Sequence, residues 1–182
     1  MKLGLYGGTF DPIHNGHTHV ITELLNLRVV DRVLLVPAGE PRLRENTPQA
    51  TGSQRRTMCQ LAINDLPAEI RSKIEVNPIE ILRMGPSYTI DTVEAIAQTY
   101  HDDEIVLIIG TDAYEKIEQW HRYDELLQMV TLEVIERPGS SAQIARNIDA
   151  IDVSATQVRL HLSDQLSPSV ANYIKEHNLY VS

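Results

Sequence analysis

The sequence has 182 residues, a length that suits a single domain, residues 1–182, with a sizeable hydrophobic core. Its formal net charge of −9 argues against a nucleic-acid-binding surface, which needs a basic face to neutralise phosphates. No apolar run approaches the roughly 20 residues of a membrane-spanning helix, and the start MKLGLYGG is too short in its apolar part for a signal peptide. We therefore expect a cytoplasmic protein whose partners include neither nucleic acid nor a membrane.

The first part of the chain predicts a strand, a turn, a helix and a second strand. Residues 2–6 (KLGLY) predict a short buried strand, and residues 7–12 (GGTFDP) predict a turn because they combine glycine, aspartate and proline. From residue 15 to about residue 27, apolar residues recur at helical spacing. Residues 32–36 (RVLLV) predict a second apolar strand, and residues 38–52 predict an exposed loop because they contain charged residues between two prolines.

The middle of the chain repeats this alternation. Ser53 is the expected N-cap of a helix that runs to about residue 66, in which the single cysteine, Cys59, is interpreted as a small buried side chain. Residues 74–81 alternate as a strand does, and residues 87–100 predict a turn followed by a helix. Residues 105–109 (IVLII) form the most apolar run, which is typical of a sheet covered on both faces.

The last part predicts a helix over residues 123–129, a strand over residues 131–135, and helices over residues 154–162 and 167–177. Alternating strands and helices predict an α/β fold, a Rossmann-like doubly wound parallel sheet with helices on both faces. Ligands in such folds bind at the carboxyl ends of the strands. The turns GGTFDP and GTD each follow an apolar strand, so both are expected to open at that edge.

The segment GGTFDPIHNGH, residues 7–17, is the strongest local motif. Its glycines let the backbone approach a ligand closely, and the helix that follows offers N–H groups to a phosphate. His14 and His17 are three residues apart, so their rings share a face if both lie in the first helical turn. There they can donate hydrogen bonds to phosphate oxygens as negative charge develops. Taken alone, the pattern is equally compatible with structural histidines, whereas a helical zinc pair more often has i, i+4 spacing and a nearby Glu.

These motifs resemble those of the nucleotidylyltransferase superfamily, and within it the bacterial nicotinate-nucleotide adenylyltransferases. The matching pieces extend along nearly the whole chain, and together they are more specific than any one of them. They are GGTFDPIHNGH (7–17), GPSYTIDT (85–92), IIGTD (108–112), Trp120, ERPG (136–139) and VSATQVR (153–159).

The resemblance implies an enzyme of NAD biosynthesis that transfers AMP from ATP to nicotinate mononucleotide and yields deamido-NAD and pyrophosphate. It also implies Mg²⁺ bound mainly through the ATP phosphates, with no metal ligands from the protein. The sequence leaves the oligomeric state open and is compatible with a homodimer. Sister enzymes that act on phosphopantetheine or nicotinamide mononucleotide, and a non-catalytic nucleotide sensor, remain as alternatives.

The resemblance assigns roles to individual residues. His14 and His17 are the expected catalytic residues, which contact the ATP phosphates and stabilise the transition state. ATP binding is expected from Gly8, Thr9, Phe10, Arg44, Ser154, Thr156 and Arg159. Acceptor binding is expected from Tyr88, Thr89, Asp112 and Trp120, with Trp120 stacked on the pyridine ring and Asp112 close to the ribose or the metal.

Several of these residues also have a purely structural interpretation. Ser154 and Thr156 are suited to capping a helix, Arg159 to a solvated surface position, and Trp120 to a core or interface. Asp112 is likewise suited to an N-cap.

The chain departs from the family pattern at two places. A Pro-Pro-His-Lys stretch is replaced by Pro-Arg-Leu-Arg, so that Leu43 stands in place of the histidine and Arg44 in place of the lysine, and arginine is not equivalent to lysine at a phosphate. Ala155 replaces the middle residue of a Ser-Ser-Thr sequence. A basic position that opens the next helix in the family is assigned by register to Arg55 rather than Arg56.

Overall fold

Short apolar runs build one parallel sheet. The computed structural model describes residues 1–39, 47–139, 142–161 and 163–181. Within them the sheet has five strands in the order β3-β2-β1-β4-β5, and every described pairing is parallel. The strands are β1 (Lys2–Gly8), β2 (Arg32–Pro37), β3 (Ile74–Val76), β4 (Glu104–Gly110) and β5 (Thr131–Ile135).

Alternation along the strands divides the core into two layers. Leu5 of β1 and Leu107 of β4 pack in one hydrophobic cluster, whereas their neighbours Tyr6 and Ile108 pack in the other. Each strand residue and the next point to opposite faces of a sheet, so a run such as IVLII supplies apolar side chains to both faces. Both faces of this sheet therefore need a covering layer of helices.

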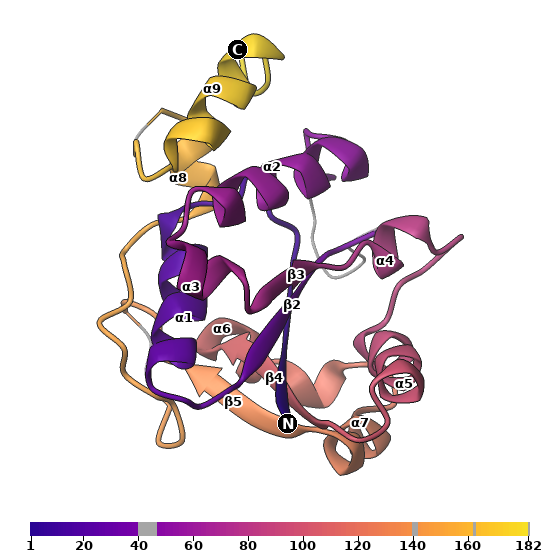
Figure 1. Cartoon of the computed structure of the whole chain (residues 1–182). Helices are drawn as coiled ribbons and strands as arrows, with labels where there is room; N and C mark the ends of the chain where they lie inside the picture. The colour runs from indigo at the N-terminus through magenta and orange to yellow at the C-terminus, as the bar shows by residue number, and fades with distance from the viewer. Residues whose placement is uncertain (40–46, 140–141, 162, 182) are drawn as a thin grey trace.

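Amphipathic helices provide those two layers (Figure 1). Apolar side chains of α1 (Asn15–Asn26), α2 (Gly52–Asn64) and α9 (Pro168–Glu176) pack on one face. Side chains of α5 (Thr89–Thr99), the 3₁₀ helix η1 (Ile117–Gln119) and α7 (Tyr123–Met129) pack on the other. The predicted Rossmann-like doubly wound fold is confirmed. Four short helices complete the description: α3 (Ala68–Arg71), α4 (Ile79–Leu82), α6 (Thr111–Tyr114) and α8 (Ala155–Arg159).

The strand predicted over residues 74–81 is wrong beyond Val76. Pro78 has no backbone N–H for the ladder, and the side-chain oxygen of Asn77 accepts a hydrogen bond from the Ile79 N–H at 3.1 Å. This local bond turns the chain into α4 instead of extending the strand. The helix predicted over residues 154–162 likewise ends early, at Arg159.

The predicted N-cap of α2 is also wrong, because Thr51 rather than Ser53 occupies that position. The Thr51 hydroxyl accepts from the Gln54 N–H at 3.2 Å, and the Thr51 N–H donates to the Gln54 side chain at 2.9 Å. This reciprocal pair is a capping box. The loop predicted as exposed is only partly so, since Ala50 near its end is buried.

The strand order places a topological switch point next to β1. The chain runs from β1 to β2 and β3 on one side, and then crosses to β4 and β5 on the other. In parallel sheets the crevice outside the carboxyl ends of the strands at such a point is the usual ligand site.

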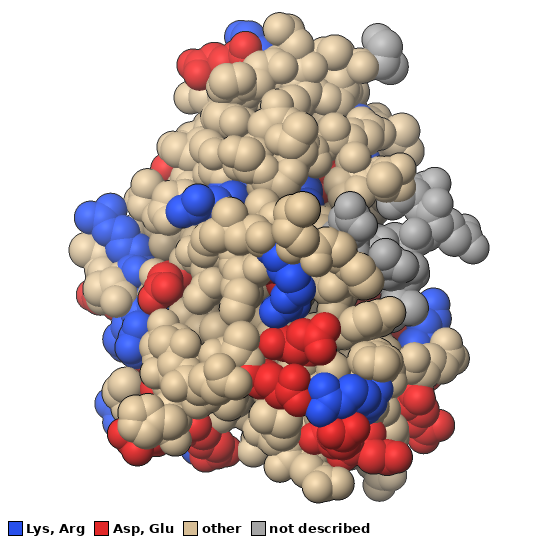
Figure 2. Space-filling view, turned by 90° about the vertical axis from the view of Figure 1, so that its right-hand side faces the viewer, with Lys and Arg blue, Asp and Glu red and all other residues tan. Residues whose placement is uncertain are grey.

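The distribution of charged side chains on the surface is consistent with the net charge of −9. Figure 2 shows the side that carries α4 and α5, where acidic and basic side chains lie side by side and no continuous basic surface crosses the described part of this view. None of the described helices is both long enough and apolar enough to cross a membrane.

Candidate active site

Three adjoining cavities lie at the carboxyl ends of β1 and β4. The inner cavity, about 260 Å³, is lined by the turn after β1, by both histidines of the motif and by the start of α8. The α1-side cavity, about 430 Å³, shares His14, His17 and Ser154 with it. The α5-side cavity, about 470 Å³, shares Gly8 and Trp120 with it. The arrangement offers two binding regions that each adjoin the inner cavity, which contains the histidine pair.

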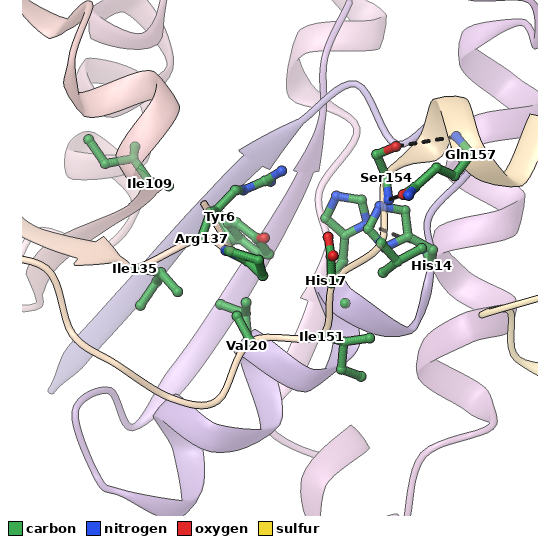
Figure 3. A pocket seen from close by; sticks show the side chains of 16 residues that line it. Tyr6, His14, His17, Val20, Ile109, Ile135, Arg137, Ile151, Ser154 and Gln157 are labelled. Atoms are coloured by element: carbon green, nitrogen blue, oxygen red, sulfur yellow. Dashed lines mark hydrogen bonds between the residues drawn. The ribbon is translucent and has the colours of Figure 1, made fainter. Parts of the chain in front are cut away.

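The α1-side cavity combines an apolar wall with polar groups at its inner end (Figure 3). Val20 of α1, Ile135 at the end of β5 and Ile151 supply the apolar wall. His17 and Arg137 lie at the end that meets the inner cavity. A flat heterocycle with a charged tail fits this distribution, because the ring contacts the apolar wall and the tail reaches the polar end.

The α5-side cavity is lined by aliphatic side chains from the ends of the strands, by aromatic and small polar side chains, and by Glu80. Tyr88, Thr89 and Trp120 all line it, as the sequence predicts. The ring of Tyr88 lies on His121 with centroids 4.3 Å apart. Thr89 is the first residue of α5, and Tyr88 is its N-cap. An aromatic ring is therefore well matched to this cavity, and the start of α5 suits an acidic group placed away from Glu80.

His14 and His17 stack on each other, with ring centroids 3.8 Å apart and an interplanar angle of 27°. His14 is the N-cap of α1, and its N–H donates to Nδ1 of His17 at 3.2 Å. Since Nδ1 of His17 accepts this bond, the proton of the neutral ring is on Nε2. Burial, helped by the positive charge of Arg137, lowers the pKa of His14 to about 4. His14 is therefore a neutral imidazole near pH 7.

The backbone of the turn after β1 is held by packing on His17. A Cβ atom on Gly8 would lie 2.8 Å from the ring of Phe10, so only glycine fits there. Phe10 has a φ of 50° and is buried, and its ring meets His17 edge-on with centroids 4.9 Å apart. Phe10 therefore contributes its side chain to orienting His17, in addition to the ATP-binding role predicted for it.

Arg55 is a buried support of the same turn. Its Nη1 donates to the Thr9 carbonyl at 2.7 Å and its Nη2 donates to the Gly39 carbonyl at 3.2 Å. Burial lowers the pKa of Arg55, and Arg56 is exposed. The residue chosen by register, Arg55, is thus the one that contacts the turn. Its guanidinium donates to backbone carbonyl groups and is not exposed to solvent.

Asp11 is a residue of the site that the sequence argument missed. Its buried carboxylate accepts hydrogen bonds from the Gln49 and Ala50 N–H groups at 2.8 and 3.0 Å, and from the Tyr180 hydroxyl at 2.7 Å. The only available signal was its place in the FDP turn, because its partners are far away in the sequence.

Ser154, the N-cap of α8, lines the inner cavity together with Thr156, whereas Arg159, the last residue of α8, is not among the described lining residues. Ser154 caps α8, since its hydroxyl accepts from the Gln157 N–H at 3.2 Å. Arg159 donates from Nη2 to the Thr156 hydroxyl at 3.1 Å and from Nη1 to the Asp11 carbonyl. Its side chain is only 20% exposed, so the interpretation as a solvated surface charge is wrong.

Asp112 and Arg137 form an ion pair across the mouth of the inner cavity, with Nε and Oδ1 3.5 Å apart. Asp112 lies in the first turn of α6 and Arg137 follows β5. The sequence argument used Arg137 only as part of the ERPG motif and gave it no role. The described part of the chain brings no three His, Cys, Asp or Glu side chains together as metal ligands.

The start of α1 and the segment around Arg44 differ from what the sequence predicts or lie outside the described residues. The first N–H of α1 was expected to be available to a phosphate, but the Asn15 N–H donates to the Gln165 carbonyl at 2.9 Å. The His17 N–H donates to the His14 carbonyl at 2.9 Å. Arg44, the predicted ATP-binding residue, lies outside the described residues, as does Leu43.

Comparisons with known proteins identify the family of this chain. Residues 5–161 match the Cytidylyltransferase-like family model. The chain is 36% identical over 192 residues to a Bacillus pumilus protein named "Probable nicotinate-nucleotide adenylyltransferase", with 100% of this chain and 99% of the relative covered. It is 34% identical over 192 residues to the nicotinate-nucleotide adenylyltransferase of Bacillus subtilis, with the same coverage.

A solved structure shares the fold. The Plasmodium falciparum nicotinic acid mononucleotide adenylyltransferase, solved in complex with NaAD, superposes with a TM-score of 0.73 at 21% sequence identity. The superposition covers 98% of this chain and 97% of that one.

Proposed function

Because the chain belongs to the nicotinate-nucleotide adenylyltransferases of the cytidylyltransferase-like family, we propose that it transfers AMP from ATP to nicotinate mononucleotide and releases pyrophosphate. One observation carries the proposal. Two cavities suited to a heterocycle each meet at an inner cavity that contains His14 and His17. This is the arrangement that joining two nucleotides through their phosphates requires.

We propose that ATP binds with its adenine in the α1-side cavity and its phosphates in the inner cavity. The apolar wall suits a purine ring, and His17 and Arg137 line the inner end, where the phosphates would lie. Arg159 would approach the phosphates from α8, where its Nη2 donates to Thr156, a lining residue of the inner cavity. The pyridine ring of the acceptor then stacks on Trp120 in the α5-side cavity. Its carboxylate is directed to the start of α5 at Thr89, where backbone N–H groups favour an anion.

The reaction in this arrangement is a direct in-line displacement. A phosphate oxygen of nicotinate mononucleotide forms a bond to the α-phosphorus of ATP. The bond from that phosphorus to the oxygen bridging to the β-phosphorus breaks, and pyrophosphate leaves with the electron pair. The nucleophile is already anionic, so it needs no general base, and no covalent enzyme intermediate is formed. Catalysis then depends on alignment and on neutralising charge.

The histidine pair supplies neutral donors for that charge. His17 presents Nε2–H because its Nδ1 is engaged by the His14 backbone. His14 stays uncharged near pH 7 because its pKa is lowered to about 4. A neutral N–H donor such as Nε2–H of His17 stabilises the negative charge that develops on the phosphate oxygens without transferring a proton to them.

Magnesium enters this proposal as part of the Mg-ATP substrate. Asp112 and Asp152 line the inner and α1-side cavities, but the described residues form no group of three potential ligands around either. This donor set fits a cation held mainly by phosphates and water, as Mg²⁺ commonly is in nucleotide sites.

The test is product formation from defined substrates. Purified protein is incubated with Mg-ATP and nicotinate mononucleotide, and deamido-NAD and pyrophosphate are quantified by chromatography. We expect equal amounts of both products, and neither product when the acceptor is omitted. ATP binding with no product in any mixture would favour a nucleotide sensor instead.

A further inference from the structure

The C-terminal end of the chain contacts the turn that carries the catalytic motif. α9 ends at Glu176, and four residues later the Tyr180 hydroxyl donates to Oδ1 of Asp11 at 2.7 Å. The Tyr180 ring is partly buried against the core cluster that contains Phe10 and Ile13. These contacts connect residues 169 positions apart in the sequence.

The Asp11 carboxylate is enclosed and nearly saturated. Only 4% of Asp11 is exposed. Oδ1 accepts from the Ala50 N–H and the Tyr180 hydroxyl, and Oδ2 accepts from the Gln49 N–H. Burial and the bond to Asp11 raise the pKa of Tyr180, so its hydroxyl stays protonated and acts as the donor. An ionised carboxylate has about four acceptor sites, and three of them are filled in this way.

Arg159 is the neighbour at the remaining side. Its Nη1 lies 3.8 Å from Oδ2 of Asp11 and donates to the Asp11 carbonyl. The guanidinium thus already forms a long ion pair with the carboxylate, while its hydrogen bonds go to the Asp11 carbonyl and, from Nη2, to Thr156. The extent to which Asp11 attracts Arg159 depends on how well the other donors satisfy its carboxylate.

We propose that Tyr180 is a positioning residue for ATP, which acts through Asp11 to hold the Arg159 guanidinium where it can meet the phosphates. The inference rests on the proposed function, because it takes Arg159 as a phosphate-binding group. When the Tyr180 hydroxyl is absent, Oδ1 loses a donor and Asp11 draws Arg159 from the long ion pair into a direct hydrogen bond. The guanidinium, held by Asp11, is then less available to bind the ATP phosphates. The acceptor end of the site, at Trp120, is unaffected.

The test compares Tyr180→Phe with Tyr173→Phe. Tyr173 is the matched control because it lies in the same C-terminal region and packs against the same core, but its ring rests on His177 and not on Asp11. Affinity for Mg-ATP is measured by calorimetry, and KM is measured for each substrate. We expect Tyr180→Phe to raise the Kd and KM for ATP about tenfold, the size of one lost bond to a charged group, with KM for nicotinate mononucleotide unchanged within twofold. Tyr173→Phe leaves all three values unchanged.

A double-mutant cycle separates this role from general destabilisation. If Tyr180 acts through Arg159, the loss of ATP affinity in Tyr180→Phe and Arg159→Lys is less than additive when both are combined. Additive losses, or an ATP affinity of Tyr180→Phe within twofold of wild type, would overturn the inference alone. Thermal unfolding, followed by circular dichroism, identifies the temperature range in which all variants are folded. Failure of the wild-type protein to bind ATP at all would instead overturn the proposed function and this inference with it.

Discussion

The ring of His17 is held between the ring of His14, stacked at 3.8 Å, and the edge of Phe10, with centroids 4.9 Å apart. The His14 N–H adds a hydrogen bond to Nδ1 of His17. These contacts fix the orientation of His17 and place the proton of its neutral ring on Nε2, which is the donor that the proposed mechanism uses. Preorganised donors are the groups whose loss most affects the rate of charge-developing reactions.

Replacing His17 by alanine is expected to lower kcat by roughly 10² or more, because a transition-state donor is lost. KM for either substrate should change much less. Steady-state pyrophosphate release measures this, with His101→Ala as the control for removing an exposed imidazole, since 76% of the His101 side chain is accessible. A kcat within a few-fold of wild type would exclude the catalytic role of His17.

The buried neutral state of His14 predicts a pH dependence of stability. Its pKa is about 4 in the folded protein and 6.5 in the unfolded chain. Between these values the unfolded state binds more protons, so the free energy of unfolding falls as the pH falls below 6.5. The expected loss from this group between pH 7 and pH 5 is about 2 kcal/mol.

Urea unfolding of wild type and His14→Gln at pH 7 and pH 5 isolates that contribution, because the other titrating groups are common to both proteins. The difference in unfolding free energy between the two pH values should be smaller in the variant. Equal pH dependence in both proteins would show that His14 is not held neutral by the fold.

Trp120→Ala is expected to raise KM for the pyridine nucleotide by about tenfold with a smaller effect on KM for ATP. The reason is that Trp120 lines the α5-side cavity, and stacking on an aromatic ring contributes about 1–3 kcal/mol to binding of a base. Trp120→Phe serves as the control, because it retains an aromatic face. If KM for the acceptor stays at the wild-type value in Trp120→Ala, the stacking assignment fails.

Gly16→Ala tests the close packing under the histidine pair. A Cβ atom there would lie 2.8 Å from Val153 and 3.1 Å from Nδ1 of His14. We expect a loss of about 1–3 kcal/mol in unfolding free energy and a fall in kcat, since His14 must move. Asn26→Ala, exposed at the far end of the same helix, provides the comparison. Alanine has a higher helix propensity than glycine. A Gly16→Ala variant more stable than wild type would therefore show that Val153 and His14 can move to accommodate the added Cβ atom, and would contradict the prediction.

Much of the fold could be predicted because its information is local. The run at residues 105–109 identifies a strand buried on both faces, and the spacing of apolar residues identifies α1. The alternation at residues 74–81 predicted too long a strand. It continues through Pro78, although the backbone changes direction there and the Asn77 side chain accepts a hydrogen bond from the Ile79 N–H. A short helix of one turn leaves no period to detect.

The site was predictable only where it follows a contiguous motif. The structure brings His14, His17 and Ser154 to one cavity, as expected, but their roles remain predictions. The supports of the site depend on long-range contacts. Arg55 reaches Thr9 across 46 positions, and Tyr180 reaches Asp11 across 169. Neither contact is visible in any local pattern of the sequence.

The central claim, AMP transfer to nicotinate mononucleotide, is tested most directly by acceptor preference. Pyrophosphate release is measured with Mg-ATP and, in parallel, nicotinate mononucleotide, nicotinamide mononucleotide or phosphopantetheine. We expect the highest kcat/KM for nicotinate mononucleotide, with the amide clearly poorer and phosphopantetheine inactive. A higher kcat/KM for either of the other two acceptors would contradict it, and would overturn the assignments of Thr89 and Trp120 to the nicotinate end.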